Sequence, residues 1–406
     1  MKAVVFHDVG DIRLDDVPEP KIQDSTDAII QITSAAICGT DLHMIRGTFP
    51  GMTPGTILGH EAVGRVEEVG SGVRNLTPGD RVVVPSTIAC GSCVYCRAGY
   101  HSQCDNANPN GPAAGTAFFG GPKATGPIDG LQAEWARIPF AHVGLVTLPM
   151  DVTDDQAILI SDIFPTGYFA AKLAEIKPGD TVAVFGCGPV GMFAIISAQL
   201  LGASRILAID CLESRLHKAR GHQAEIINFN EEDPIEAIRE LTGGIGVDRA
   251  IDAVGVDAVS AKTGPAAEEA RKNQAQFQQE QRDIAPEARG QGSHWVPGDA
   301  PSQVLRWSVE ALAKAGTLAI VGVYPPQDRC FPIGEAMNKN LTINMGNCHH
   351  RHYIPEIIRL VRSGRVNPID VLTQIEPLTS ALDAYEQFDQ RKAGWMKVEL
   401  KPSAAQ

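Results

Sequence analysis

The spacing of hydrophobic and polar positions divides the chain into two regions with different predicted secondary structure. Up to about residue 150, short apolar runs rich in β-branched residues are separated by Gly, Pro and Asp, as in the Pro-Gly-Asp turn at residues 78–80. Runs such as residues 28–32, 62–69 and 81–84 are typical of β-strands, and helical periodicity is scarce among them. We therefore expect an irregular β-barrel-like domain in this first region.

From about residue 181, strands alternate with helices. An apolar run at 181–185 leads through a glycine-rich turn into a long apolar helix at 190–201. We expect a further helix at 214–220 and further strands in these ranges: 205–209, 226–229, 248–253 and 317–321. Strands that alternate with helices predict a doubly wound parallel sheet, so the fold class is α/β.

One stretch, residues 257–303, interrupts this alternation. It is rich in Gln, Ala and Glu over residues 266–282 and rich in Gly and Pro over residues 290–301. We expect either a solvated surface insertion or, because the stretch follows a strand at the sheet edge where ligands bind, a cover over a bound cofactor. After about Gly346, a helix at 354–363 and shorter elements are expected to pack back on the first domain.

Composition and charge narrow the class of protein. The chain has 406 residues, of which 44 % are hydrophobic and 20 % charged, which suits a large buried core and excludes dominant disorder. Its net charge of −13 disfavours nucleic acid and anionic membranes as partners. No apolar run reaches the roughly 18 residues of a membrane span, and the N-terminus lacks a signal-peptide pattern. We expect a cytosolic protein that acts on a small molecule.

Four of the nine cysteines fall within fifteen residues, with the spacing C-x2-C-x2-C-x7-C. They are Cys90, Cys93, Cys96 and Cys104. Thiolates three residues apart on a tight turn can bind one ion, and four of them complete a tetrahedral zinc site. Such a closed site predicts a structural zinc, with an iron–sulfur cluster as the alternative.

A second metal site is indicated by Cys38 and His60. One thiolate and one imidazole make a pair of zinc ligands that would need a third protein ligand and leave a fourth position for substrate. Either of two neighbouring carboxylates could orient a ligand or tune the ion, and a hydroxyl and an imidazole nearby could move a proton. These neighbours are Asp41, Glu61, Thr40 and His43.

The glycine-rich turn after the strand at 181–185 predicts a dinucleotide site. Its residues are Gly186, Cys187, Gly188, Pro189, Val190 and Gly191. Glycines there allow a tight turn and close backbone approach, and the following helix N-terminus accommodates a pyrophosphate. Asp210 ends the next strand, where a carboxylate binds ribose hydroxyls and repels a 2′-phosphate, which favours NAD. Arg215 is close enough to the site to bind a 2′-phosphate, so NADP stays an alternative cofactor. Arg215 could equally be a solvated helix residue.

The run Gly59-His60-Glu61-x-x-Gly64, followed by Gly70 and Val73, resembles the signature of the zinc-containing medium-chain alcohol dehydrogenases. With the cysteine cluster and the glycine-rich turn, essentially the whole chain resembles this family. The resemblance implies a GroES-like β-barrel catalytic domain with a structural zinc lobe, a Rossmann NAD-binding domain, and a C-terminal segment that returns to the catalytic domain. The corresponding ranges are 1–163, 164–345 with the insertion 257–303, and 346–406. It also implies a homotetramer or homodimer.

In that family the catalytic zinc commonly takes a second cysteine just before a Thr-Gly pair, whereas this chain has Asp162 before Thr166-Gly167. A carboxylate there is characteristic of the glutathione-independent formaldehyde dehydrogenase and aldehyde dismutase branch, although Asp162 could also be a helix N-cap. The resemblance assigns Cys38, His60 and Asp162 as the zinc ligands. It assigns Thr40 and His43 as the proton relay. It places Thr166 beside the nicotinamide and Lys397 beside the pyrophosphate.

The remaining cysteines and a histidine group are expected to be structural. Cys187, Cys211, Cys330 and Cys348 have no partners at metal-binding spacing. The group His349, His350 and His352 could bind a metal, but is interpreted as the exposed start of a helix.

These features predict an NAD-dependent oxidoreductase with two zinc ions per chain that acts on a small alcohol or on an aldehyde of the formaldehyde type. Dismutation would follow if the insertion slowed cofactor release. The alternatives are a general primary or secondary alcohol dehydrogenase and a catalytically silent protein that binds zinc and nucleotide. The four-cysteine lobe argues against a polyol dehydrogenase.

Overall fold

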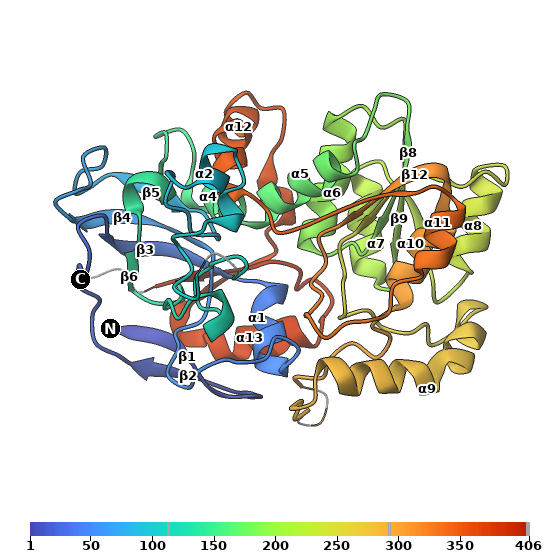
Figure 1. Ribbon diagram of the computed structural model, residues 1–406, viewed down its shortest axis with the longest axis horizontal. Helices are drawn as coiled ribbons and strands as arrows, with labels where there is room; N and C mark the ends of the chain where they lie inside the picture. The colour runs from blue at the N-terminus through green and yellow to red at the C-terminus, as the bar shows by residue number, and fades with distance from the viewer. Residues whose placement is uncertain (112–113, 291, 293, 403–406) are drawn as a thin grey trace. The chain divides into compact units, whose positions relative to one another are not determined.

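The computed structural model describes residues 1–111, 114–290, 292 and 294–402 (Figure 1). The chain forms two compact units. Unit 1 comprises Met1–Pro165, Glu287–Val296 and Cys348–Gln406, and unit 2 comprises Thr166–Pro286 and Pro297–Asn347. The C-terminal segment therefore belongs to the same unit as the first region of the chain.

Unit 1 is built on a seven-stranded sheet in the order β14-β15-β3-β4-β5-β7, with β6 also paired to β3. The strands are β3 (Ala28–Ile37), β4 (Ala62–Val69), β5 (Arg81–Val84), β6 (Trp135–Ile138), β7 (Val146–Thr147), β14 (Gln374–Pro377) and β15 (Val398–Lys401). A separate hairpin joins β1 (Lys2–Asp8) to β2 (Asp11–Asp16). The strands expected at 62–69 and 81–84 are confirmed. The strand expected at 28–32 is longer than expected and runs on to Ile37, because its apolar positions continue.

The helices of unit 1 begin or end where the candidate ligands lie. Helix α1 (Gly39–Arg46) follows β3 directly, and α4 (Asp154–Ser161) stops just before Asp162. The others are α2 (Val94–Arg97), α3 (Ala141–Gly144), α12 (His350–Arg362) and α13 (Ala381–Asp389), with short 3-10 turns at His101–Gln103, Lys123–Thr125, Pro368–Val371 and Leu378–Ser380. Helix α5 (Ile163–Leu173) starts in unit 1 and continues in unit 2.

Unit 2 contains a parallel sheet of six strands in the order β10-β9-β8-β11-β12-β13. Its strands are β8 (Thr181–Phe185), β9 (Arg205–Asp210), β10 (Glu225–Asn228), β11 (Val247–Asp252), β12 (Leu312–Ile320) and β13 (Thr342–Met345). Its helices besides α5 are α6 (Pro189–Leu200), α7 (Glu213–Gly221), α8 (Pro234–Leu241), α9 (Ala266–Ile284), α10 (Gln303–Ala311) and α11 (Ile333–Asn338). This order is that of the doubly wound dinucleotide-binding fold, so the α/β class is confirmed.

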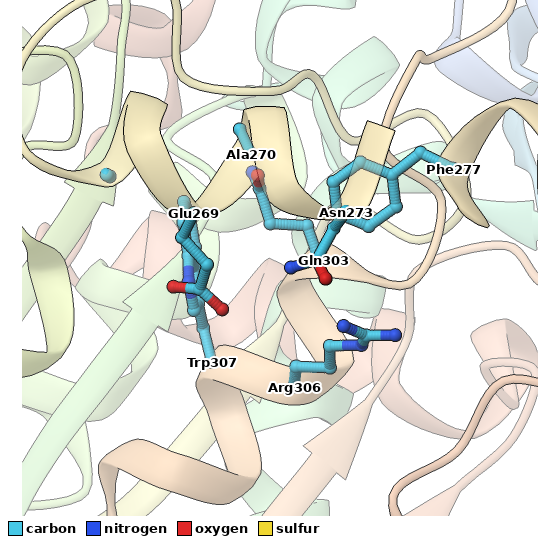
Figure 2. Close-up of a pocket in the computed structure, with 8 residues that line it drawn as sticks. Glu269, Ala270, Asn273, Phe277, Gln303, Arg306 and Trp307 are labelled. Carbon is cyan, nitrogen blue, oxygen red and sulfur yellow. The ribbon is translucent and has the colours of Figure 1, made fainter. Parts of the chain in front are cut away.

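The regular part of the polar insertion is the helix α9, which belongs to unit 2. Its apolar side chains recur at helical spacing and are buried, among them Ala270, Phe277 and Ile284. Figure 2 shows a small pocket between α9 and α10, where the guanidinium of Arg306 lies 5.9 Å from the centre of the Phe277 ring. All the residues that line this pocket come from α9 and α10, so it includes none of the predicted site residues.

The end of the insertion, Glu287–Val296, belongs to unit 1, although the sequence places it in the nucleotide-binding domain. The Trp295 side chain is buried, and its backbone N–H donates to Asp389 Oδ2 at 2.8 Å. The other oxygen of Asp389 accepts from Nη2 of Arg46, at the end of α1, at 2.7 Å. This segment is therefore anchored beside the helix that carries Thr40 and His43, and is not a solvated loop over its whole length.

Candidate zinc and nucleotide sites

The end of β3 presents Cys38 to the interior of unit 1. Cys38 is extended, with φ −119° and ψ 158°, and is the N-cap of α1. Its backbone N–H donates to Asp41 Oδ2 at 3.0 Å, which satisfies one of the groups that a strand-to-helix junction leaves without a partner. The local sequence therefore fixes where the Cys38 thiol lies.

Four buried residues bring their donor atoms to one place in unit 1. Cys38, His60, Glu61 and Asp162 each offer one ligand atom, and these atoms lie within 4.8 Å of one another. Asp162 Oδ2 is 3.1 Å from His60 Nε2 and 3.9 Å from Cys38 Sγ. The structure thus brings together the three residues that the resemblance assigns as zinc ligands.

Asp162 lies between α4 and α5, at the position that an N-cap would occupy. Its carboxylate, however, faces two imidazoles: Oδ2 is next to His60, and Oδ1 accepts from Nε2 of His350 at 2.7 Å. Burial raises its pKa, but the hydrogen bond from His350 and the two nearby imidazoles of His350 and His60 outweigh burial and hold the pKa well below the usual range. Asp162 is therefore an anionic donor in the cluster.

The donor set fits a zinc ion. Neither ring nitrogen of the buried His60 has a well-aligned hydrogen bond among the described residues, so Nε2 faces the thiol and the carboxylate as an unused donor. Burial, together with the negative charges of Glu61 and Asp162, raises the pKa of the Cys38 thiol despite the opposing effect of His60. A thiolate at this position thus needs added positive charge, and sulfur, nitrogen and oxygen donors of this kind are those zinc prefers.

Asp41, and not Glu61, is the carboxylate that orients His60. Asp41 Oδ1 is 3.1 Å from His60 Nδ1, the ring nitrogen that faces away from the cluster. Asp41 Oδ2 accepts from Gln132 Nε2 at 3.2 Å, and Gln132 Oε1 in turn accepts from the hydroxyl of Tyr385 at 2.8 Å. A carboxylate on the outer nitrogen fixes the tautomer and orientation of a ligating imidazole.

Lys397 pairs with a buried carboxylate. The resemblance assigns it to the pyrophosphate, but its side chain is fully buried in unit 1. Its ammonium lies 2.5 Å from Glu61 Oε2 and donates to the carbonyl of Ile37 at 3.0 Å. Its charge therefore pairs with the buried Glu61, and the pyrophosphate contact stays a prediction. Burial raises the pKa of Glu61 to about 7, even though Lys397 opposes this shift.

The two residues of the predicted proton relay lie on α1. Thr40 Oγ1 is 3.9 Å from Cys38 Sγ, and the buried His43 follows three residues later on the same face of the helix. Nδ1 of His43 is 2.8 Å from Thr48 Oγ1, and the hydroxyl of Thr48 donates to the His43 carbonyl at 3.1 Å. Thr48 therefore fixes the His43 ring, a role that sequence reasoning missed.

Sequence reasoning also misjudged part of the histidine group. His350 is buried at the start of α12 and donates to Asp162, while its Nδ1 lies 3.1 Å from Thr87 Oγ1. Only His352 is exposed, and His349 is half-buried, with Nδ1 at 2.8 Å from Ser102 Oγ. The interpretation as an exposed helix start is therefore wrong for His350. No local signal indicates this contact, because it joins residues 188 positions apart.

The four clustered cysteines also converge. Cys90, Cys93, Cys96 and Cys104 each offer a sulfur within 4.8 Å of the others, and the sulfurs of Cys93 and Cys104 are 4.0 Å apart. Tetrahedral zinc with bonds of about 2.3 Å would set sulfurs about 3.8 Å apart. Burial opposes ionisation of Cys90, but hydrogen bonds from Ser92 and Cys93 lower its pKa to about 6. None of the nine cysteines, all of which lie in the described part of the chain, forms a disulfide, so the lobe is not held by disulfides.

The glycine-rich turn in unit 2 has the geometry of a nucleotide-binding turn. Gly186 has φ 89°, and a Cβ on Gly191 would lie 1.8 Å from the Gly186 carbonyl oxygen, so neither position tolerates a side chain. Helix α6 begins at Pro189, after the N-cap Gly188. The backbone N–H of Cys187 donates to Asp210 Oδ2 at 2.8 Å, which ties the turn to the end of β9.

Three further predicted cofactor residues lie in unit 2. Arg215, on α7, has Nη1 3.6 Å from the position of a Cβ built on Gly188, so its guanidinium is beside the turn and not directed into solvent alone. Thr166 lies on α5. Val190, in the first turn of α6, follows Pro189 at the helix N-terminus.

None of the described helices is both long and apolar enough to cross a membrane.

Comparison with known proteins agrees with this architecture. Residues 24–149 match the alcohol dehydrogenase GroES-like domain, and residues 189–266 match the zinc-binding dehydrogenase family. An uncharacterized zinc-type alcohol dehydrogenase-like protein of Bacillus subtilis, AdhB, is 39 % identical over 99 % of this chain and 100 % of its own length. A glutathione-independent formaldehyde dehydrogenase of Pseudomonas aeruginosa is 32 % identical over 96 % of this chain and 94 % of its own.

Among solved structures, an alcohol dehydrogenase from a Thermus species superimposes with a TM-score of 0.79 at 34 % identity. The match covers 99 % of this chain and 100 % of the other. The fold is therefore a GroES-like catalytic domain joined to a Rossmann domain, and the protein belongs to the family of zinc-type medium-chain alcohol dehydrogenases.

Proposed function

We propose that this protein is an NAD-dependent dehydrogenase that holds two zinc ions per chain and oxidises a small alcohol or a hydrated aldehyde. The observation that carries this proposal is the convergence of Cys38, His60 and Asp162, one donor atom each, in the interior of unit 1. Three protein ligands leave a fourth position for a substrate oxygen, as in catalytic zinc sites, whereas the four-cysteine lobe is a closed site.

When bound, zinc supplies Lewis acidity that stabilises negative charge on a substrate oxygen, and NAD supplies the hydride acceptor. The chain itself removes the hydroxyl proton. Because the Thr48 hydroxyl donates to the His43 carbonyl, Thr48 Oγ1 accepts from His43 Nδ1–H. This selects the neutral tautomer in which Nε2 is basic, so His43 can accept a proton at Nε2, and the Thr40 hydroxyl would stand at the substrate end of the proposed relay.

We propose further that the substrate is an aldehyde of the formaldehyde type. A carboxylate ligand at position 162 and the likeness to the Pseudomonas aeruginosa formaldehyde dehydrogenase support this. The Phe118 ring centre lies 6.1 Å from those of both His60 and Phe49, so aromatic rings pack beside the His60 ligand, which favours a small substrate. The hydrated aldehyde would lose a hydride from carbon and a proton from oxygen, and would leave as the acid.

The substrate proposal is tested with labelled formaldehyde and NAD, with formate and methanol followed by NMR. We expect formate, and the Asp162→Ala variant should form none under the same conditions. Methanol in equal amount, without net NADH, would identify dismutation. Oxidation of simple alcohols without any formate would contradict the aldehyde proposal and would indicate a general alcohol dehydrogenase.

The cofactor proposal rests on Asp210. Its carboxylate ends β9 beside the glycine-rich turn, where it would repel the 2′-phosphate of NADP. Asp210→Asn keeps the shape of the side chain and removes its charge, which should raise the ratio of kcat/KM for NADP to that for NAD by roughly tenfold, about 1.4 kcal/mol. An unchanged ratio would contradict the assignment, and Arg215→Ala, which removes a cation beside the turn, should shift the ratio the opposite way.

A further inference from the structure

We infer that His350 is a positioning residue for the zinc ligand Asp162: it holds one carboxylate oxygen so that the other alone faces the metal site. The inference rests on the proposed zinc site and adds to it a residue from the far end of the chain. It follows from a juxtaposition within unit 1, where the start of α12 meets the junction between α4 and α5.

The two oxygens of Asp162 have different surroundings. Oδ1 accepts from Nε2 of His350 at 2.7 Å, whereas Oδ2 lies 3.1 Å from His60 Nε2 and 3.9 Å from Cys38 Sγ. The last torsion of an aspartate is soft, so an unrestrained carboxylate would turn and could offer both oxygens to one ion. A hydrogen bond to Oδ1 prevents this and leaves a coordination position for substrate.

His350 is itself held in place. Its Nδ1 lies 3.1 Å from Thr87 Oγ1, and the hydroxyl of Thr87 is 3.4 Å from the Cys348 carbonyl. Thr87 and His350 are both buried, and Thr87 follows the end of β5 closely. The chain of contacts from Thr87 through His350 to Asp162 therefore fixes the carboxylate from a rigid strand end.

This arrangement explains why a carboxylate ligand needs a partner that a thiolate does not. A cysteine offers one sulfur, which has no second atom to restrain. An aspartate offers two oxygens of equal strength until one of them is engaged. The outer partners of metal ligands typically change metal affinity by about 10- to 100-fold, which sets the size of the effect to expect from His350.

The experiment is a titration of the full-length zinc-loaded protein with a competing chelator, with zinc per chain as the readout. The four-cysteine zinc serves as an internal reference that the substitutions should not disturb. We expect His350→Ala to lower the affinity of the other zinc by about 10- to 100-fold and to change the visible spectrum of cobalt(II) in that position. His350→Gln, which keeps an N–H donor on the side chain, should recover part of the affinity. His352→Ala, which removes an exposed ring on the same helix, should change neither.

A double-substitution cycle with Asp162→Cys separates positioning from general damage. In the Asp162→Cys protein there is no second oxygen to hold, so adding His350→Ala should cost little further zinc affinity. The inference would be overturned if His350→Ala lowered zinc affinity equally in the wild-type and the Asp162→Cys proteins. It would also be overturned if His350→Ala alone changed neither the zinc affinity nor the cobalt spectrum. If His350→Ala does not fold, Thr87→Val provides the same test through the second contact. A wild-type protein that holds only the cysteine-bound zinc would instead refute the proposed zinc site itself.

Discussion

The two metal-binding clusters of unit 1 are built in opposite ways. The cysteine lobe takes all four donors from residues 90–104, and nearby backbone N–H groups and the side-chain amide of Asn106 donate to its sulfurs. The open cluster takes Cys38 from the end of β3, His60 from just before β4 and Asp162 from the end of α4. A closed site can take all its ligands from one short segment, because it only has to hold the metal in a tetrahedron of donors. An open site needs side chains from distant parts of the fold to orient its ligands.

The difference is also visible in what supports each donor. Ser92 and Cys93 donate backbone N–H groups to Cys90 Sγ at 3.4 Å, which any tight turn of this kind supplies. His60 and Asp162 depend instead on the side chains of Asp41 and His350, which are distant in sequence from the residues they contact. Loss of one supporting side chain should therefore matter more in the open cluster than in the lobe.

The largest expected effect comes from removing a ligand of the open cluster. Asp162→Ala leaves two protein donors, so the zinc there should dissociate and turnover should fall by at least about 10²-fold. Zinc analysis should show one ion per chain left in the lobe, with the circular dichroism spectrum unchanged. Full retained activity would mean that Asp162 is not a ligand.

The matching change in the lobe should act on stability more than on chemistry. Cys104→Ser removes one donor of a closed site, and loss of a structural metal is among the changes that cost roughly 4 kcal/mol or more. Urea unfolding should show this loss, while the zinc that remains should be the one bound by Cys38. A variant with wild-type stability and no activity would reverse the roles assigned to the two clusters.

A smaller effect is expected from the carboxylate that orients His60. Asp41→Asn keeps the volume of the side chain but weakens the contact with His60 Nδ1 at 3.1 Å. We expect zinc affinity at the open cluster to fall by about 10- to 100-fold. Competition with a chelator measures this directly. Glu61→Gln is the comparison, because Glu61 pairs with Lys397 and not with the outer nitrogen of His60.

The smallest effect should come from the corresponding side chain in the lobe. Asn106 Nδ2 donates to Cys90 Sγ at 3.2 Å, in addition to the backbone donors. Asn106→Ala removes one of several such bonds and should lower the free energy of unfolding by about 1 kcal/mol, with zinc retained. If this variant lost zinc as readily as Asp41→Asn, the contrast between the two clusters would not hold.

Much of this picture can be predicted from the sequence, because its signals are local. The strands β4, β5 and β8, the turn at Gly186 and the cysteine lobe each follow from a run or a spacing. Cys38 and His60 follow from their residue types, the family resemblance adds Asp162, and the structure brings these three residues together. Strand β13 was not expected, because its four residues are half-buried or exposed at a sheet edge and carry little apolar pattern.

The remaining features depend on contacts between distant parts of the chain, which leave no periodic trace. Lys397 reaches Glu61, His350 reaches Asp162, and Trp295 of the insertion reaches Asp389. A lysine, a histidine and a tryptophan in polar surroundings look solvent-exposed when read locally. Only the return of the C-terminal segment and of Glu287–Val296 to unit 1 buries these three side chains.

The most direct test of the account is the zinc content of the pure wild-type protein, measured beside that of Asp162→Ala by plasma mass spectrometry. We predict two zinc ions per chain in the wild type and one in the variant. One zinc per chain in both proteins would show that the cluster of Cys38, His60 and Asp162 holds no metal, and would contradict the proposed catalytic site.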